Sequence, residues 1–299
     1  MWDLRLKFKE LVEIIVESDI KALNSQQIIN TFNLSLTPVE SIELQNIMVP
    51  STTIIIPAYD EEKRIGSVLG DIVDFVTVNN LKWDVIVSID GSDNTKEIVK
   101  GFSKDYSFVK YESGRGRSGK GHAIKRVVGK SMGEFTLIAD ADGAVSIRDI
   151  LNGLPYCGKY DAILFGRYTT NGNAIPLYRR IPSRGFNILV RAMLGLKVTD
   201  TQCGYKLVRT SIIREAFKRI AVTNAFFDVA LLYHIQKMGG RIKEIEVKYS
   251  HRDGSKFNIL ASILSLGISL FAFRTRHSRF YRYVPHWATD LYLRKFRWI

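Results

Sequence analysis

Two aspartates one residue apart, Asp140 and Asp142, close the stretch "FTLIADADGA", which begins with mostly apolar residues. Alternate residues of a strand point to the same side, so we expect both carboxylates to converge on one cation. Oxygen ligands favour Mg²⁺ or Mn²⁺, and such an ion would offset the repulsion between the two charges. It would also stabilise the negative charge that develops on a departing diphosphate. The alternative is a pair of solvated carboxylates in a turn.

Two other polar stretches, "PAYDEE" and "SIDGSDNT", offer groups that suit a nucleoside. Tyr59 presents an aromatic face for a base, and Glu61 or Glu62 can accept hydrogen bonds from base or ribose. Pro57 fixes the exit from the preceding strand. Asp90 can accept a hydrogen bond from a nucleobase. The alternatives are that the acidic residues stabilise the first turn of a helix and that Asp90 caps a turn.

The glycine-rich and basic stretch "GRGRSGKGHA" could cradle a diphosphate with backbone N–H groups and Lys120. It is not a P-loop, because Gly121 follows the lysine where that motif has Ser or Thr. The alternative is a flexible, solvated loop.

Cationic residues further along the chain suggest a second phosphate site. Arg179 and Ser183 are four residues apart in "RRIPSRGFNILVRAMLG", which places them on one helical face. Together with Arg167 they could hold a phosphate, for which guanidinium groups are well suited. The alternative is an ordinary cationic surface.

Short apolar runs alternate with helical stretches between residues 52 and 249. The expected strands are "TTIIIP", "WDVIVSID", "FTLIADAD", "YDAILFGR" and "RIKEIEVKYS". Near-continuous apolar strands that alternate with helices predict an α/β fold with a mostly parallel central sheet covered by helices. Ligands of such sheets bind beyond the carboxyl ends of the strands, where this chain places its polar stretches.

Composition narrows the function classes. The 299 residues are 46% hydrophobic, enough for a large α/β domain, and the formal charge of +13 favours an anionic partner. The two cysteines lack the spacing of a zinc site, and a reducing compartment suits them best. No nucleic-acid-binding motif accompanies the basic residues, so we expect no nucleic-acid partner.

The chain ends are expected to be appendages of the central domain, with boundaries at 1–50, 51–256 and 257–299. The first segment has the pattern of an amphipathic helix. The last contains the apolar run "FNILASILSLGISLFAF", slightly short for a membrane span, followed by a tail rich in Arg, Tyr and Trp. That mixture suits lipid headgroups, so an in-plane or re-entrant anchor is preferred over a full span. The alternative is a buried helix with a solvated basic tail.

The order of these motifs resembles that of the family-two, inverting GT-A glycosyltransferases, over roughly residues 52–256. The motifs "PAYDEE", "DGSDNT", "GKGHA", "DADGA", "DTQCGYK" and "FFDVALL" more closely resemble the dolichyl-phosphate β-glucosyltransferases. These enzymes transfer glucose from UDP-glucose to a polyprenyl phosphate at a membrane. The resemblance implies a nucleotide-sugar-binding GT-A fold, a divalent metal, and a location at the cytoplasmic face of a membrane, peripheral or re-entrant.

The resemblance also implies roles for individual residues. Nucleotide-sugar binding is assigned to Pro57, Tyr59, Glu61, Asp90, Lys120, Asp140, Ala141 and Asp142. Metal binding is assigned to Asp140 and Asp142, and Asp142 is a candidate for a direct catalytic role. Asp228 is a second catalytic candidate, which could orient the sugar or phosphate; the alternative is a structural Asp at the start of a helix. Binding of the acceptor phosphate is assigned to Arg167, Arg179, Ser183 and Lys206.

Three positions depart from the family pattern. The chain has Ile89 before Asp90 where relatives have two aspartates, and Ala144 where the mannose synthases have a glutamine that adds a metal ligand. Ala230 replaces an acidic residue. The alternatives are the same fold with GDP-mannose or a glycan acceptor, a non-catalytic lipid-binding scaffold, and a nucleic-acid-binding module.

Overall fold

The computed structural model describes residues 49–166, 177–220, 224, 226–247 and 259–278. Most of the expected N-terminal segment, Arg167, and the tail after residue 278 lie outside the described residues.

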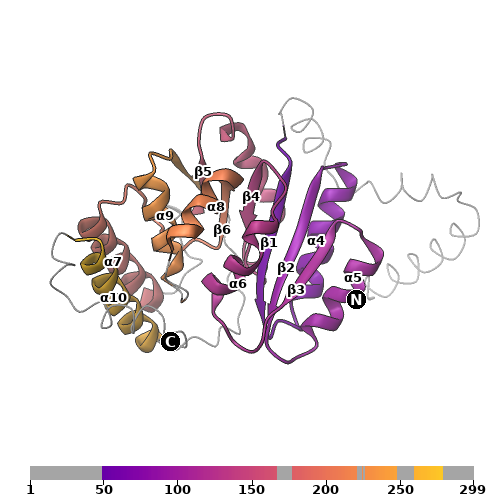
Figure 1. Cartoon of the computed structure of the whole chain (residues 1–299), viewed down its shortest axis with the longest axis horizontal. Helices are drawn as coiled ribbons and strands as arrows, with labels where there is room; N and C mark the ends of the chain where they lie inside the picture. Colours follow the sequence, from indigo (N-terminus) through magenta and orange to yellow (C-terminus); the bar gives the residue numbers. More distant parts are fainter. Residues whose placement is uncertain (1–48, 167–176, 221–223, 225, 248–258, 279–299) are drawn as a thin grey trace, which may run out of the picture. The chain divides into compact units, whose positions relative to one another are not determined.

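Seven strands form one mixed sheet in the order β3-β2-β1-β4-β6-β5-β7 (Figure 1). Their bounds are β1 Thr52–Tyr59, β2 Trp83–Asp90, β3 Val109–Ser113, β4 Phe135–Ile138, β5 Ala162–Gly166, β6 Tyr205–Arg209 and β7 Ile242–Glu246. Strand β6 is antiparallel to β4 and β5, and the other neighbouring pairs are parallel. The expected α/β fold with a mostly parallel sheet is confirmed.

Helices connect these strands and cover the sheet. Their bounds are α4 Ile65–Val78, α5 Thr95–Asp105, α6 Lys120–Val127, α7 Leu177–Leu194, α8 Thr210–Arg219, α9 Phe227–Lys237 and α10 Ile259–Arg276. Short 3-10 helices are η2 Val128–Lys130, η3 Ile147–Asn152 and η4 Leu154–Tyr156. Residues of α6, α8 and α9 share one hydrophobic cluster with one face of β1, β4, β5 and β6.

Strand β1 is buried on both of its faces. Ile55 packs into the cluster with α6, while Ile54 and Ile56, which alternate to the other face, are also fully buried. A strand in such a position gains from apolar side chains at every position rather than at alternate ones. The three consecutive isoleucines therefore reflect a central strand between two helical layers.

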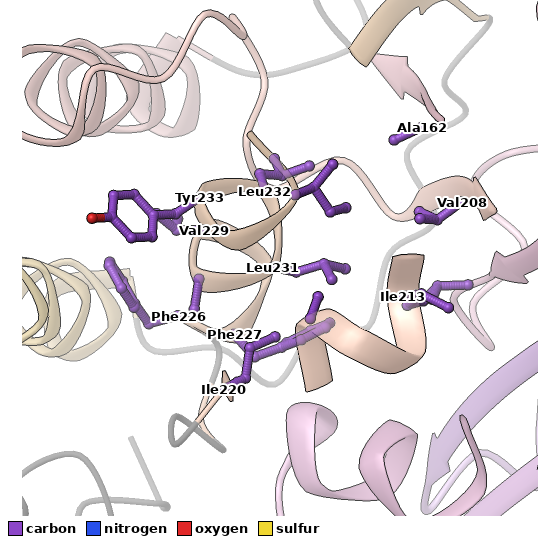
Figure 2. Packing of buried hydrophobic residues seen from close by; sticks show 14 of the residues in the cluster. Ala162, Val208, Ile213, Ile220, Phe226, Phe227, Val229, Leu231, Leu232 and Tyr233 are labelled. Carbon is purple, nitrogen blue, oxygen red and sulfur yellow. The ribbon is translucent and has the colours of Figure 1, made fainter. Parts of the chain in front are cut away.

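Helix α9 forms the centre of the cluster. Each residue from Phe227 to Ile235 is buried, so this helix is packed on all sides. Figure 2 shows Leu231 on the side of α9 that faces Ile213 of α8 and Val208 of β6. Phe226, just before α9, and Tyr233 both pack against Phe273 of α10. Helix α9 therefore packs between the sheet and α10.

Helix α10 lies beside α7 and is partly embedded in the domain (Figure 1). Ser269, Leu270 and Phe273 are buried, and the buried Asn224 side chain donates a hydrogen bond to Ser269 Oγ at 3.1 Å. Across the described residues, no helix combines the length and the hydropathy that a bilayer span requires. The anchoring role expected of 257–299 stays a prediction.

The aromatic contact between α9 and α10 predicts a pH dependence of stability. His234 is buried beside His277, with ring centroids 5.5 Å apart. Burial, helped by the positive potential of His277 and Arg219, lowers the pKa of His234 to about 4. The unfolded chain binds that proton at the ordinary pKa, so protonation on acidification favours unfolding between about pH 6.5 and 4.

We expect stability to fall through this window by up to about 1.4 kcal/mol per pH unit from this group. In urea titrations at several pH values, His234→Phe should have a flatter profile than the wild type. Subtracting the unfolding free energy of the variant from that of the wild type at each pH cancels the contributions of carboxylates that titrate in both proteins. Parallel profiles would contradict the prediction.

Candidate active site

The polar stretches meet at one edge of the sheet. Strands β1, β2 and β4 run parallel, and β5 shares their direction because β4 and β5 are both antiparallel to β6. Their carboxyl ends therefore carry Tyr59, Asp90, Asp140 and Gly166 to the same side. The expectation that ligand-binding residues gather at this edge agrees with the topology.

The acidic turn after β4 differs from the sequence expectation in its local geometry. Strand β4 ends at Ile138, so Asp140 and Asp142 do not alternate along a strand as expected. Pairing with β1 stops at Ile138, and the chain then turns through Gly143, whose φ of 64° is left-handed. Asp142 Oδ1 accepts a hydrogen bond from the Ala144 backbone N–H at 3.0 Å. The turn, rather than strand alternation, sets the direction of the two carboxylates.

Lys120 and Asp228 lie beside the acidic turn. Together with Asp140 they form a row of charged side chains whose sign alternates. Lys120, the first residue of α6, places its Nζ 2.7 Å from Asp140 Oδ1 and 3.8 Å from Asp228 Oδ2. Burial disfavours its charged form, but attraction by Asp140 and Asp228 outweighs this and raises the pKa of Lys120 above its ordinary value. Lys120 therefore stays cationic at the site.

Lys206 completes this row from inside the protein. Its Nζ lies 2.6 Å from Asp228 Oδ1 and also donates a hydrogen bond to the Cys203 carbonyl oxygen. Lys206 is fully buried, and Asp228 is buried as well. The Lys206 ammonium is thus engaged within the protein, and its expected contact with the acceptor phosphate stays a prediction.

Asp90 holds the glycine-rich loop in place. Its Oδ1 accepts from Arg126 at 2.7 Å, and its Oδ2 accepts from the Ser118 backbone N–H at 3.0 Å and from the Ser118 hydroxyl. A Cβ at Gly114 would collide with both Asp90 and Arg126, so the loop passes close to this pair because Gly114 has no side chain. Both carboxylate oxygens are thus engaged within the protein, and a nucleobase contact stays a prediction.

The loop after β1 lies against the loop after β2. The Glu61 backbone N–H donates to Thr95 Oγ1 at 2.8 Å, and the Glu62 N–H donates to Asp93 Oδ2 at 2.9 Å. The Glu61 carboxylate pairs with Arg64 at 2.6 Å. Burial nevertheless raises the pKa of Glu61, with a smaller contribution from Asp142. The Asp142 carboxylate therefore lies within electrostatic range of the predicted nucleoside-binding loop.

Tyr59 stands exposed at the end of β1, with 40% of its surface accessible. The guanidinium carbon of Arg117 lies 4.9 Å from the centre of its ring, within cation–π range. The ring is a suitable platform for a base, and the basic loop reaches over it. Pro57, two residues earlier in β1, is half-buried.

Gly204 makes room for the acidic turn. A Cβ at this position would collide with the Asp140 carboxylate, which therefore lies directly against the backbone just before β6. The next residue, Tyr205, is buried, and burial, together with the charges of Asp140 and Asp142, raises its pKa. Both carboxylates are thus close to the start of β6.

We expect Gly204→Ala to lower the catalytic rate by about 10²-fold, because it displaces the Asp140 carboxylate while leaving the fold intact. A matched control is Gly101→Ala in α5, where a Cβ would meet nothing within 4 Å. Initial rates and thermal melting of both variants provide the measurement. Wild-type rates for Gly204→Ala would contradict the prediction.

The sequence model of the family described as "Glycosyl transferase family 2" matches residues 53–217, more than half of the chain. The chain belongs to glycosyl transferase family 2. It is therefore a glycosyltransferase, and the matched residues lie within the expected 51–256 domain. The domain boundaries themselves stay predictions.

Curated relatives of this glycosyltransferase carry a common name. It is 33% identical over 244 residues to dolichyl-phosphate beta-glucosyltransferase of Drosophila melanogaster, covering 75% of this chain and 74% of the relative. It is 30% identical to the protein of that name in Homo sapiens, covering 75% of each chain. In Dictyostelium discoideum the identity is 29%, covering 75% and 74%.

Solved structures support the GT-A fold of this family. Mannosyl-3-phosphoglycerate synthase from Rubrobacter xylanophilus superposes with a TM-score of 0.58 at 12% identity, covering 85% of this chain and 82% of that one. Glucosyl-3-phosphoglycerate synthase from Mycobacterium tuberculosis, solved with Mn²⁺, UDP and glucosyl-3-phosphoglycerate, gives 0.57 at 16% identity, covering 80% and 84%. At these identities the likeness concerns the fold alone.

The acidic turn of this family 2 enzyme suits a cation. Within the described part of the chain, no three His, Cys, Asp or Glu side chains cluster as a metal site. Asp140 nevertheless already binds a positive group, the Lys120 ammonium, and its second oxygen lies against the Gly204 backbone, where a side chain would displace it. Two carboxylates would leave the remaining positions of a Mg²⁺ or Mn²⁺ ion to water and phosphate oxygens, as such ions prefer.

The expected acceptor residues are only partly described. Arg179 and Ser183 both belong to α7, four residues apart, and Arg167 lies outside the described residues. The buried Asn187 of α7 accepts hydrogen bonds from the Thr201 N–H at 3.1 Å and the Thr201 hydroxyl at 2.6 Å. These bonds tie α7 to the loop that leads to Gly204.

Sequence reasoning missed four residues that support the site: Ser118, Arg126, Asn187 and Gly204. Each of them contacts a partner at least fourteen residues away along the chain, so neighbouring residues do not reveal its role. Gly204 was the most accessible to prediction, because it lies in "DTQCGYK", a stretch singled out for its resemblance.

Proposed function

We propose that this glycosyltransferase transfers glucose from UDP-glucose to dolichyl phosphate or another polyprenyl phosphate. The substrates are suggested by relatives about 30% identical over three quarters of the chain that are named for this reaction. The observation that carries the chemistry is the contact between Asp140 and the Lys120 ammonium beside Asp142. This contact brings a cationic group and a cation-binding group together, which supports the binding of a nucleotide diphosphate beside them.

Such a reaction requires little base catalysis. A phosphate monoester is already ionised near neutral pH, so the protein has mainly to align it with the sugar carbon and stabilise the leaving UDP. In-line attack from the face opposite UDP inverts the anomeric centre and gives a β-linked product from an α-linked donor. A bound Mg²⁺ or Mn²⁺ would supply charge stabilisation to the diphosphate.

Different residues would bind the cation, the nucleotide and the acceptor phosphate. Asp140 and Asp142 would hold the cation, with the Ala141 backbone between them, and Lys120 would bind the diphosphate. Tyr59, Glu61 and Asp90 would form the nucleoside side of the site, next to Pro57. Arg179 and Ser183 of α7, with Arg167, would hold the acceptor phosphate. Asp228 would act as a positioning residue, since its oxygens face Lys120 and Lys206.

The test is incubation of the full chain with a polyprenyl phosphate, Mn²⁺ or Mg²⁺, and a panel of nucleotide sugars that includes GDP-mannose. We expect a lipid-linked glucose product from UDP-glucose, with β configuration by NMR of the anomeric proton. A preference for GDP-mannose would favour the same fold with another donor. Failure to turn over any donor would reject the proposal.

A lipid acceptor requires access to a membrane, and we place the contact on α7 and α10. These helices lie side by side, and each exposes large apolar residues: Ile188 and Leu189 on α7, Ile268 and Phe271 on α10. Arg191 and Arg274 are exposed on the same two helices and suit anionic headgroups. The enzyme would then lie at the cytoplasmic face of a membrane, peripheral or re-entrant.

We expect Phe271→Asp to weaken binding to phosphatidylcholine vesicles containing phosphatidylserine by about tenfold or more, because burial of a large apolar side chain contributes about 1.5–3 kcal/mol. Val78→Asp is a matched control, since Val78 is similarly exposed at the end of α4. Vesicle sedimentation measures both. Equal losses in the two variants would argue against a contact through α10.

A further inference from the structure

The cation-binding carboxylate of the acidic turn is occupied by a side chain of the protein itself. The Lys120 Nζ is 2.7 Å from Asp140 Oδ1, a hydrogen-bonded ion pair, and 3.8 Å from Asp228 Oδ2. Lys120 also lies over the ring of Phe227 at 5.6 Å. Three contacts from two elements therefore direct this ammonium to the position where Asp140 would bind a metal ion.

The charges of the site are nearly balanced without a metal ion. Asp140, Asp142 and Asp228 carry three negative charges, and Lys120 and Lys206 carry two positive ones. A divalent cation that entered alone would meet the Lys120 ammonium at Asp140 and leave the group with a net positive charge. The diphosphate of a nucleotide sugar that arrives with the ion brings two negative charges and restores the balance.

We propose that Lys120 is an internal cation that closes the metal site of the free enzyme, so that the divalent ion binds together with the nucleotide diphosphate. The inference rests on the proposed function, because it requires a nucleotide sugar as donor. When the diphosphate arrives, Lys120 exchanges Asp140 for a phosphate oxygen, and Asp140 turns to the metal ion. Asp228, held by Lys206, keeps the ammonium within reach of both positions.

This arrangement couples two ligands through one side chain. Because the coupling is reciprocal, UDP should raise the affinity for Mn²⁺ by the same factor by which Mn²⁺ raises the affinity for UDP. Much of this factor should depend on Lys120. Its removal should make the free protein a better Mn²⁺ binder and a poorer UDP binder at the same time, a combination that mere loss of structure would not produce.

The experiment measures Mn²⁺ binding by electron paramagnetic resonance of the free ion, with and without UDP. It compares the wild-type chain, Lys120→Met, and the control Lys130→Met, whose lysine lies on the surface and pairs with Glu112. Methionine retains the contact with Phe227. Lys120→Gln is measured in parallel, and thermal melting selects the variants that are folded.

We expect Lys120→Met without UDP to bind Mn²⁺ at least tenfold more tightly than the wild type, and UDP to enhance its binding much less. Lys130→Met should match the wild type. Equal or weaker Mn²⁺ binding by both Lys120 variants, alongside UDP-dependent binding by the wild type, would overturn the inference and leave the proposed function intact. Absence of UDP-dependent Mn²⁺ binding in the wild type would count against both.

Discussion

Asp142→Asn is expected to lower kcat for sugar transfer by about 10²–10³-fold, the size of a lost electrostatic contribution to a transition state. The substitution removes one of two carboxylates that would hold the cation at the leaving diphosphate. Asparagine retains an oxygen that can accept the Ala144 N–H hydrogen bond, so the turn should keep its shape. The measurement is the rate of glucose transfer at saturating donor, with UDP binding and thermal melting recorded on the same samples.

The matched control is Asp74→Asn, which removes a carboxylate from the exposed side of α4. It should leave the rate unchanged. Near-wild-type turnover of Asp142→Asn with Mn²⁺ present would refute the role of the acidic turn. A loss of rate that accompanied a collapse in melting temperature would instead assign Asp142 to folding.

Lys206→Met is expected to lower the free energy of unfolding by about 3–5 kcal/mol, the usual loss when one member of a buried ion pair is removed. Lys206 is fully buried, and its ammonium is the close partner of the buried Asp228 at 2.6 Å. Methionine fills similar space but leaves the carboxylate without that partner. Urea unfolding followed by circular dichroism provides the measurement.

Lys218→Met on α8 is the control for loss of a lysine ion pair, because Lys218 is 74% exposed and pairs with Glu215 at 2.9 Å. It should cost less than about 1 kcal/mol. The double variant Lys206→Met with Asp228→Asn should be more stable than Lys206→Met alone, since it removes the orphaned charge. A single-variant loss as small as that of the control would contradict this account.

The sequence was sufficient for the elements whose patterns are local. Strand β1 could be predicted because a strand buried on both faces requires the unbroken run at Ile54–Ile56. The gathering of Asp90 and Asp140 at one edge of the sheet could likewise be predicted, since parallel strands bring their carboxyl ends to one edge. Strands β3 and β6 carry no such run and were missed; β6 is a short segment within a polar motif.

The site residues likewise differ in whether neighbouring residues of the sequence reveal their role. Tyr59, Lys120, Asp140 and Asp142 lie in short motifs whose chemistry is evident from residue type. Lys206 was assigned to a phosphate from its charge, whereas its burial and its pairing with Asp228 could not be predicted from the sequence. Burial depends on α9 and β6, which are separated along the chain and meet only in the folded domain.

By itself, the sequence determined the fold class, the family and the pair of carboxylates that follows a buried strand, because strand burial and short motifs depend on neighbouring residues. Only the tertiary structure decided which charges meet. The row from Asp140 through Lys120 and Asp228 to Lys206 joins the turn after β4 to α6, α9 and β6, and its residues are spread over 109 positions, from 120 to 228. Ion pairs depend on distances of a few ångströms, and packing of the whole domain sets those distances.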